Sequence, residues 1–129
     1  FQQFNLIPSL SVAANIGFQA RLAGRFDAGW TAHMAGVLGL TALLGRYPDE
    51  LSGGQQQRVA IGRALGSRPG LILADEPTGN LDEATGEAVL GLMLDLVAES
   101  GAALLMVTHS DRLAGRLARR LHLRAGRVA

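Results

Sequence analysis

Leu71-Ile72-Leu73-Ala74-Asp75-Glu76-Pro77 is the stretch that decides the fold. Its four apolar residues do not alternate with polar ones, which is typical of a strand buried on both faces of a parallel sheet. Two adjacent carboxylates follow at the C-terminal end, the edge at which open α/β sheets bind their ligands. We therefore expect a parallel strand that delivers Asp75 and Glu76 to a binding site.

Downstream of this strand the pattern continues as alternating helices and strands. A helix is expected over residues 83–99 with Gly101 as its stop, and a second buried strand over residues 102–107. A short helix capped by Ser110 or Asp111 should follow, and then a third strand near Leu121 and Leu123 that turns at residues 125–126. This order indicates an α/β fold with a parallel core.

Upstream of the strand the periodicity is helical. We expect one short helix after Ser9, a second over residues 30–44, and a third over residues 54–65 with Ser52 as its N-cap. Gly62 inside the third helix should cost about 1 kcal/mol relative to alanine, so tertiary packing must hold that helix. A helical part therefore precedes the α/β part.

Composition limits the classes of function. The 129 residues carry a net charge of +1, from 12 basic and 11 acidic side chains, so no overall charge attracts nucleic acid or anionic lipid. Every basic residue is arginine, and cysteine is absent, so neither a disulfide framework nor a thiolate metal site is available. The longest apolar stretch, residues 37–44, is too short to span a bilayer. The chain starts without methionine and in mid-pattern, and we interpret both ends as cuts.

Three local patterns suggest chemistry, and each also has a simpler structural explanation. Asp75 and Glu76 suit Mg²⁺ and the activation of a water, although a solvated acidic turn would look the same. Leu51-Ser52-Gly53-Gly54-Gln55 exposes backbone N–H groups at a helix start, which makes an anion site or simply a capped helix. His109 follows a strand and could bind a phosphate, although a lone histidine is more often structural. His33 and His122 have no such setting.

The motifs together resemble the ATP-binding-cassette (ABC) ATPases. In chain order, the features are Gln2, residues 51–58 (Leu-Ser-Gly-Gly-Gln-Gln-Gln-Arg), residues 75–82 (Asp-Glu-Pro-Thr-Gly-Asn-Leu-Asp) and Thr108-His109. They are similar to the Q-loop, the signature motif, Walker B with the D-loop, and the H-loop. The resemblance covers the whole chain. It implies a partial P-loop NTPase (RecA-like) parallel sheet core with an ABC-type helical subdomain, the helical part at 1–67 and the core part at 68–129.

The resemblance also implies roles for single residues in a site that uses ATP and Mg²⁺. Asp75 would hold Mg²⁺ through water, Glu76 would be the general base, and His109 would touch the γ-phosphate. Gln2 would contact Mg²⁺ or the lytic water, and its loop would face the membrane partner. The loop of Ser52, Gly53, Gly54 and Gln55 would bind ATP held by a second ATPase subunit in a head-to-tail dimer, with Asp82 between the two sites. Permease subunits would be the other partners, at the cytoplasmic face of the inner membrane, and nucleic acid is not expected as a partner.

One family motif is missing from this sequence. The P-loop, Gly-x-x-x-x-Gly-Lys-Ser/Thr, requires a lysine, and the chain has none. We therefore expect the 129 residues alone neither to bind ATP tightly nor to hydrolyse it. We also expect the strand at residues 71–75 to leave an apolar edge open where a P-loop strand would lie.

Three classes of function remain open. Residues 1–8 (Phe-Gln-Gln-Phe-Asn-Leu-Ile-Pro) and 74–82 are most similar to the branch of LolD, MacB and FtsE, which serve lipoprotein release, efflux and cell division. That branch favours an ATPase subunit of a membrane transporter. The alternatives are an ABC ATPase without a transport role and a non-functional truncated product. The sequence does not indicate the cargo.

Overall fold

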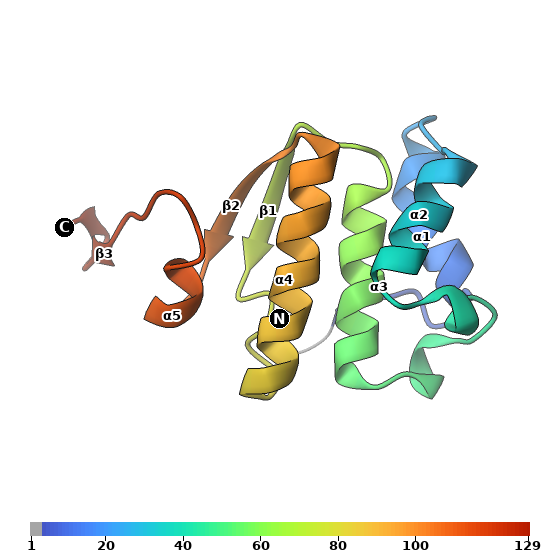
Figure 1. Cartoon of the computed structure of the whole chain (residues 1–129), viewed down its shortest axis with the longest axis horizontal. Helices are drawn as coiled ribbons and strands as arrows, with labels where there is room; N and C mark the ends of the chain where they lie inside the picture. Colours follow the sequence, from blue (N-terminus) through green and yellow to red (C-terminus); the bar gives the residue numbers. More distant parts are fainter. Residues whose placement is uncertain (1–3) are drawn as a thin grey trace.

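The computed structural model describes residues 4–129, so Gln2 lies outside the described residues. Figure 1 shows an elongated arrangement with the first three helices at one end and the C-terminal hairpin at the other. The elements are α1 (Val12–Leu22), α2 (Ala28–Val37), two 3₁₀ turns (Thr41–Leu43 and Pro48–Glu50), α3 (Gly53–Leu65), β1 (Leu71–Asp75), α4 (Glu83–Ser100), β2 (Ala103–Val107), α5 (Asp111–Ala114), β3 (Leu123–Arg124) and β4 (Arg127–Val128).

The expected pair of parallel strands is confirmed. β1 pairs with β2 in parallel, with Leu71 opposite Ala103 and Asp75 opposite Val107, and α4 is the crossover between them. Helix α4 begins at the N-cap Asp82 and ends at Gly101, whose φ of 72° is the left-handed conformation that glycine adopts most readily. Both strands therefore end at the same edge of the sheet.

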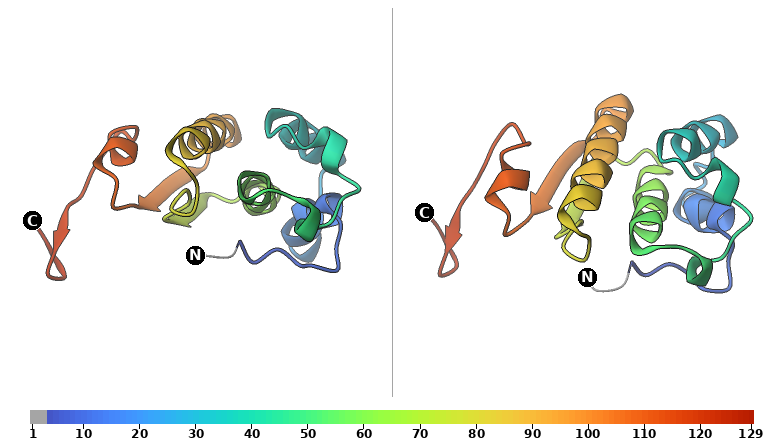
Figure 2. Two further views of the ribbon diagram at one scale, coloured as in Figure 1. Left: turned by 90° about the horizontal axis from the view of Figure 1, so that it is seen from below. Right: turned by 60° about the horizontal axis from the view of Figure 1, so that its bottom comes forward.

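The expectation that β1 and β2 are buried on both faces is wrong. Helix α4 covers one face, and no element in the described part of the chain covers the other (Figure 2). On the open face the side chains of Leu71, Leu73, Leu105 and Val107 are 54%, 70%, 57% and 55% exposed. An unbroken apolar run therefore did not distinguish a strand covered on one face from a strand covered on two.

Two further boundaries differ from expectation. The turn expected at residues 125–126 is present, with positive φ at Ala125 and Gly126, and it folds β4 back antiparallel onto β3. Residues 123–124 do not join the parallel sheet, because β3 and β4 pair only with each other. Helix α2 ends at Val37, before residue 44, because Gly39 takes a φ of 68° and the amide of Leu40 bonds back to the carbonyl of Ala35.

The core forms where α3 packs between the first helices and α4. A Cβ at Gly62 would lie 3.2 Å from Leu38 Cδ1 and 3.5 Å from Ile16 Cγ1, so the glycine allows close approach of α1 and the end of α2 to α3. This is the tertiary packing that the sequence required for that helix. Fully buried members of the cluster come from both halves of the chain: Ile16, Met34, Leu38, Leu65, Leu90 and Leu96.

Candidate functional site

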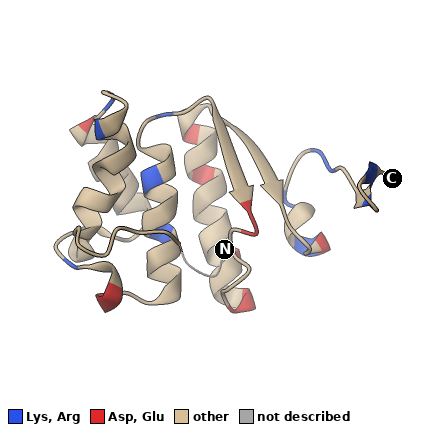
Figure 3. Ribbon diagram, turned by 180° about the vertical axis from the view of Figure 1, so that it is seen from behind, with Lys and Arg blue, Asp and Glu red and all other residues tan. Residues whose placement is uncertain are grey.

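The C-terminal edge of the parallel sheet carries the two adjacent carboxylates. Asp75 is the last residue of β1, and the amide of Glu76 donates a 2.9 Å hydrogen bond to the carbonyl of Val107 on β2. Glu76 has a φ of 45°, a region that non-glycine residues seldom occupy and that typically costs about 1–3 kcal/mol. Figure 3 shows acidic residues, in red, at this end of β1 and in the first turn of α4. The backbone thus turns sharply where the carboxylates are presented.

Glu76 and His109 are in direct contact. The amide of His109 donates a 2.7 Å hydrogen bond to Glu76 Oε1, and the hydroxyl of Thr108 lies 3.4 Å from Oε2. The imidazole Nε2 is 3.5 Å from Oε1, and its side chain is 96% exposed. Glu76 is thus oriented by the segment after β2, while the imidazole of His109 remains accessible to a ligand.

Three of the residues expected at the site border one cavity. A hollow of about 530 Å³ is lined by Glu76, His109 and Asp82, with Thr78 and Arg112 among its other walls. Asp82 caps α4 by accepting from the amide of Thr85 at 2.9 Å and from its hydroxyl at 2.6 Å. The hydroxyl bond is the largest cause that lowers the pKa of Asp82 below its ordinary value, and the amide bond adds to it. Asp82 therefore stays ionised at this rim.

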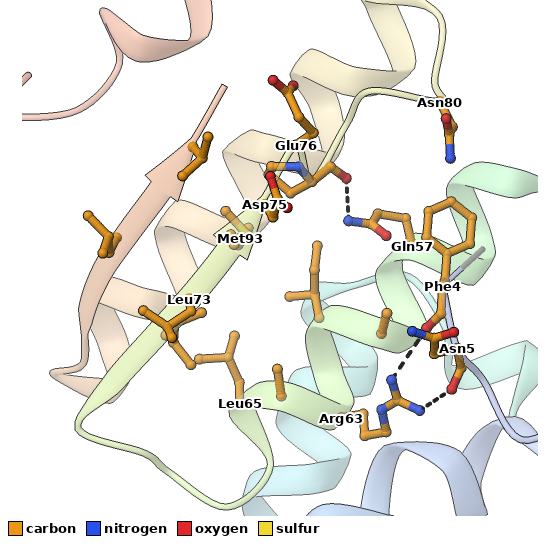
Figure 4. Close-up of a pocket in the computed structure, with 18 residues that line it drawn as sticks. Phe4, Asn5, Gln57, Arg63, Leu65, Leu73, Asp75, Glu76, Asn80 and Met93 are labelled. Atoms are coloured by element: carbon orange, nitrogen blue, oxygen red, sulfur yellow. Dashed lines mark hydrogen bonds between the residues drawn. The ribbon is translucent and has the colours of Figure 1, made fainter. Parts of the chain in front are cut away.

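Asp75 faces a second, larger cavity of about 690 Å³, which it shares with Glu76, Gln57 and Asn80 (Figure 4). Residues 4–129 contain no group of three or more histidine, cysteine, aspartate or glutamate residues that could hold a metal ion. Mg²⁺ is commonly bound by one or two carboxylates together with water and phosphate oxygens. Asp75 fits one such ligand, and the remainder of the coordination shell would come from nucleotide and water.

The signature residues form a helix cap at the start of α3. Ser52 Oγ accepts from the amide of Gln55 at 3.2 Å, and Gln55 Oε1 accepts from the amide of Ser52 at 2.9 Å. Gly54 packs against α4, because a Cβ there would lie 2.8 Å from Thr85 Cγ2. A Cβ on Gly53 would lie 3.7 Å from Leu81 Cδ2. Residues 52–55 line neither the Glu76–His109 cavity nor the Asp75 cavity.

Two side chains of α3 contact the neighbouring motifs, and sequence reasoning missed both. Gln57 is 7% exposed and donates to the carbonyl of Pro77, directly after the carboxylate pair. Arg63 donates to the carbonyls of Phe4 and Asn5. The available signal was a polar residue at helical spacing with the apolar residues of α3, but it did not identify the partners.

The remaining histidines keep a structural interpretation. His33 Nε2 is 2.5 Å from Glu99 Oε2, and its ring lies 5.7 Å from the ring of Trp30. His122 is exposed near the C-terminal hairpin. Neither lines the two cavities described above.

Comparison with known proteins identifies the family. The family model for ABC transporters matches residues 1–79. The chain is 47% identical over 131 residues to an uncharacterized ABC transporter ATP-binding protein of Mycobacterium tuberculosis, covering 99% of this chain and 53% of the relative. It is 44% identical over 131 residues to the lipoprotein-releasing system ATP-binding protein LolD of Oleidesulfovibrio alaskensis, covering 99% and 57%.

A solved structure gives the same answer for the fold. The dimeric ATP-binding cassette MJ0796 bound to ADP and Pi is 37% identical with a TM-score of 0.79, and the match covers 99% of this chain and 58% of that one. A partial ABC-cassette fold, with a parallel α/β core preceded by helices, is therefore the class that the fold defines. The chain belongs to the ABC transporter family.

The match covers this chain almost completely, but the chain spans only 53% and 57% of the two curated relatives, about half their length. Among the described residues, no helix combines the length and the apolar character needed to cross a membrane.

Proposed function

We propose that this chain supplies the signature loop and the Walker B half of an ABC transporter ATPase that couples ATP hydrolysis to transport across, or extraction from, a membrane. The observation that carries the proposal is the contact of Glu76 with His109 at the C-terminal edge of β1 and β2. It places a fixed carboxylate and an accessible imidazole where parallel sheets bind their ligands.

In the proposed reaction Glu76 is the general base that accepts a proton from the attacking water. Its two carboxylate oxygens are oriented by the His109 amide and the Thr108 hydroxyl, so the base is positioned before substrate arrives. Asp75 would hold Mg²⁺ through water, and the His109 imidazole would contact the γ-phosphate. Gln2 would contact Mg²⁺ or the lytic water.

We further propose that Ser52, Gly53, Gly54 and Gln55 bind the γ-phosphate of ATP held by a second ATPase subunit. Their position supports this division, because they do not line the cavity that Glu76 and His109 share in their own chain. Asp82 lies between the two sites of such a head-to-tail dimer. The similar cassette MJ0796 is described as dimeric.

The membrane context is also a proposal. Relatives over nearly the whole chain include ATP-binding proteins of lipoprotein-releasing systems from several bacteria. Their names describe ATP-binding proteins of a larger system. We propose permease subunits as the partners and the cytoplasmic face of the inner membrane as the location. The cargo is selected by those permease subunits.

We propose that the 129 residues need a P-loop from outside this sequence for activity. The chain contains no lysine and therefore no P-loop lysine to hold the β- and γ-phosphates. Alone, it should neither bind ATP tightly nor hydrolyse it.

A chimaera tests the proposal directly. This chain would replace the matching half of the 47% identical Mycobacterium tuberculosis relative, and ATP turnover would be measured before and after Glu76→Gln. Loss of the base should reduce turnover by about 100-fold or more. The control Asp95→Asn changes an exposed carboxylate of α4 and should leave turnover unchanged. A chimaera that folds and binds ATP but keeps its rate after Glu76→Gln would refute the role of Glu76.

A further inference from the structure

The guanidinium of Arg63 holds the chain segment that follows Gln2. Arg63 lies near the end of α3, and its Nη1 donates to the carbonyl of Asn5 at 2.7 Å while Nη2 donates to the carbonyl of Phe4 at 3.3 Å (Figure 4). Because the five donors of arginine lie in one rigid plane, two bonds to consecutive carbonyls fix the direction of the segment as well as its distance. Burial of this charge lowers the pKa of Arg63.

A second helix holds the same segment a few residues later. The side chain of Asn15 on α1 is fully buried, and its Oδ1 accepts from the amide of Ile7 at 2.8 Å. Its Nδ2 lies within hydrogen-bond distance of the carbonyls of Ile7, Leu10 and Ser11. The part of the segment nearest Gln2 is thus fixed by Arg63, and the part nearest α1 is fixed by Asn15.

Helix α3 contacts two other motifs in addition to this segment. Its first turn is the signature cap at Ser52, and Gln57 donates to the carbonyl of Pro77 after the carboxylate pair. Ser52 and Arg63 are eleven positions apart, about 16 Å at 1.5 Å per residue. One continuous helix therefore connects the segment after Gln2, the turn after Glu76, and the signature loop.

We propose that Arg63 is a positioning residue that fixes the segment following Gln2 to the signature helix, so that a displacement of this segment moves α3 and the signature loop with it. The meaning of this coupling for ATP hydrolysis rests on the proposed function. The tether itself does not, and it can be measured without nucleotide.

The test uses the absence of cysteine from the chain. Asn5→Cys gives a single attachment point for a nitroxide label at an exposed side chain, and it keeps the backbone carbonyl that Arg63 contacts. Electron paramagnetic resonance then reports label mobility with Arg63, with Arg63→Met and with Arg63→Lys. The matched control is Arg25→Met, at an exposed arginine between α1 and α2.

Arg63→Met should shorten the rotational correlation time of the label severalfold, and Arg25→Met should leave it unchanged. Arg63→Lys keeps the charge but not the planar pair of donors. Its label mobility should therefore lie between that of the chain with Arg63 and that of Arg63→Met. Amide exchange at Ile7 and Leu10 should change little, because Asn15 still holds that part of the segment. A general loss of structure would instead speed exchange in α4 as well.

Equal label mobility with Arg63 and with methionine, in a folded chain, would overturn the proposal. If the methionine variant does not fold, the lysine variant decides, and a spectrum identical to that of the Arg63 chain would also overturn it. An inactive chimaera with intact label immobilisation would refute the proposed function while leaving the tether in place.

Discussion

The backbone amide of His109 donates a 2.7 Å hydrogen bond to Glu76 Oε1, and this contact joins the ends of the two parallel strands. It orients the carboxylate through backbone rather than through the imidazole. A substitution of the His109 side chain should therefore leave Glu76 in place, since the amide donor remains.

The separate roles of the His109 amide and the His109 imidazole can be measured in the chimaera. His109→Ala should lower turnover, because the proposed imidazole contact to the γ-phosphate would be lost. The free energy of unfolding should change by no more than about 0.5 kcal/mol at this exposed side chain. Urea unfolding checks the predicted stability, and steady-state turnover on the same preparation checks the predicted loss of rate. A large loss of stability would show that the imidazole itself supports the turn.

Gly54→Ala should destabilise the fold by about 1–3 kcal/mol, because the new Cβ would meet Thr85 Cγ2 at 2.8 Å. Urea unfolding measures the change. Gly36→Ala is the control on α2, where a Cβ has nothing within 4 Å, and it should stabilise by about 0.5–1 kcal/mol. Thr85→Ser removes only the clashing methyl and keeps the hydroxyl bonded to Asp82, so it should recover stability in the Gly54→Ala background.

Gln57→Met should lower the free energy of unfolding by about 1–3 kcal/mol, because it leaves the Pro77 carbonyl without its donor in a buried position. Gln19→Met makes the same chemical change on the exposed face of α1 and should stay within about 0.5 kcal/mol. Equal effects at the two positions would contradict the importance of the Gln57 contact.

Asp82 should contribute stability that depends on pH. Hydrogen bonds from Thr85 lower its folded-state pKa below the ordinary 3.8, so its contribution is present above that value and is lost as pH falls through the lower, folded-state pKa. Asp82→Asn should therefore lower Tm at neutral pH, and the difference should shrink in strong acid. A Tm difference that is the same at every pH would rule out ionisation as its origin.

The open sheet face should make the chain self-associate. Leu73 and Leu105 are opposite each other across β1 and β2, at 70% and 57% exposure, and adjoin other exposed apolar residues. Leu73→Gln should reduce concentration-dependent light scattering. Leu22→Gln removes an equally exposed leucine from the end of α1, away from the sheet, and should have little effect. A wild-type chain that stays monomeric at high concentration would contradict this expectation.

Local patterns predicted much of the fold. Ser52 was identified as an N-cap and Gly101 as a helix stop because caps and left-handed glycines depend on a few neighbouring residues, and both appear in the structure. The carboxylates also lie at the end of β1 as expected. These features need no knowledge of what packs above or below the chain.

The features that could not be predicted depend on distant partners. Leu73 is apolar whether its face is covered or open, so its sequence context could not show that it is 70% exposed. Gln57 and Arg63 bond to carbonyls 20 and 58 positions away, and backbone carbonyls have no sequence signature. For the same reason, the sequence placed Glu76 and His109 at neighbouring strand ends but did not predict that the His109 amide holds the carboxylate.

The closed cap at Ser52 also affects ligand choice. Its amide already donates to the Gln55 side chain, and the Gln55 amide already donates to the Ser52 side chain, so two of the loop's backbone donors are occupied by its own groups. In the proposed role, an arriving γ-phosphate exchanges these neutral acceptors for charged oxygens, and charge-assisted hydrogen bonds are roughly twice as strong as neutral ones. ADP has no γ-phosphate to compete with Gln55. In that proposed role the loop would discriminate triphosphate from diphosphate by competition, and its resting state is an ordinary helix cap.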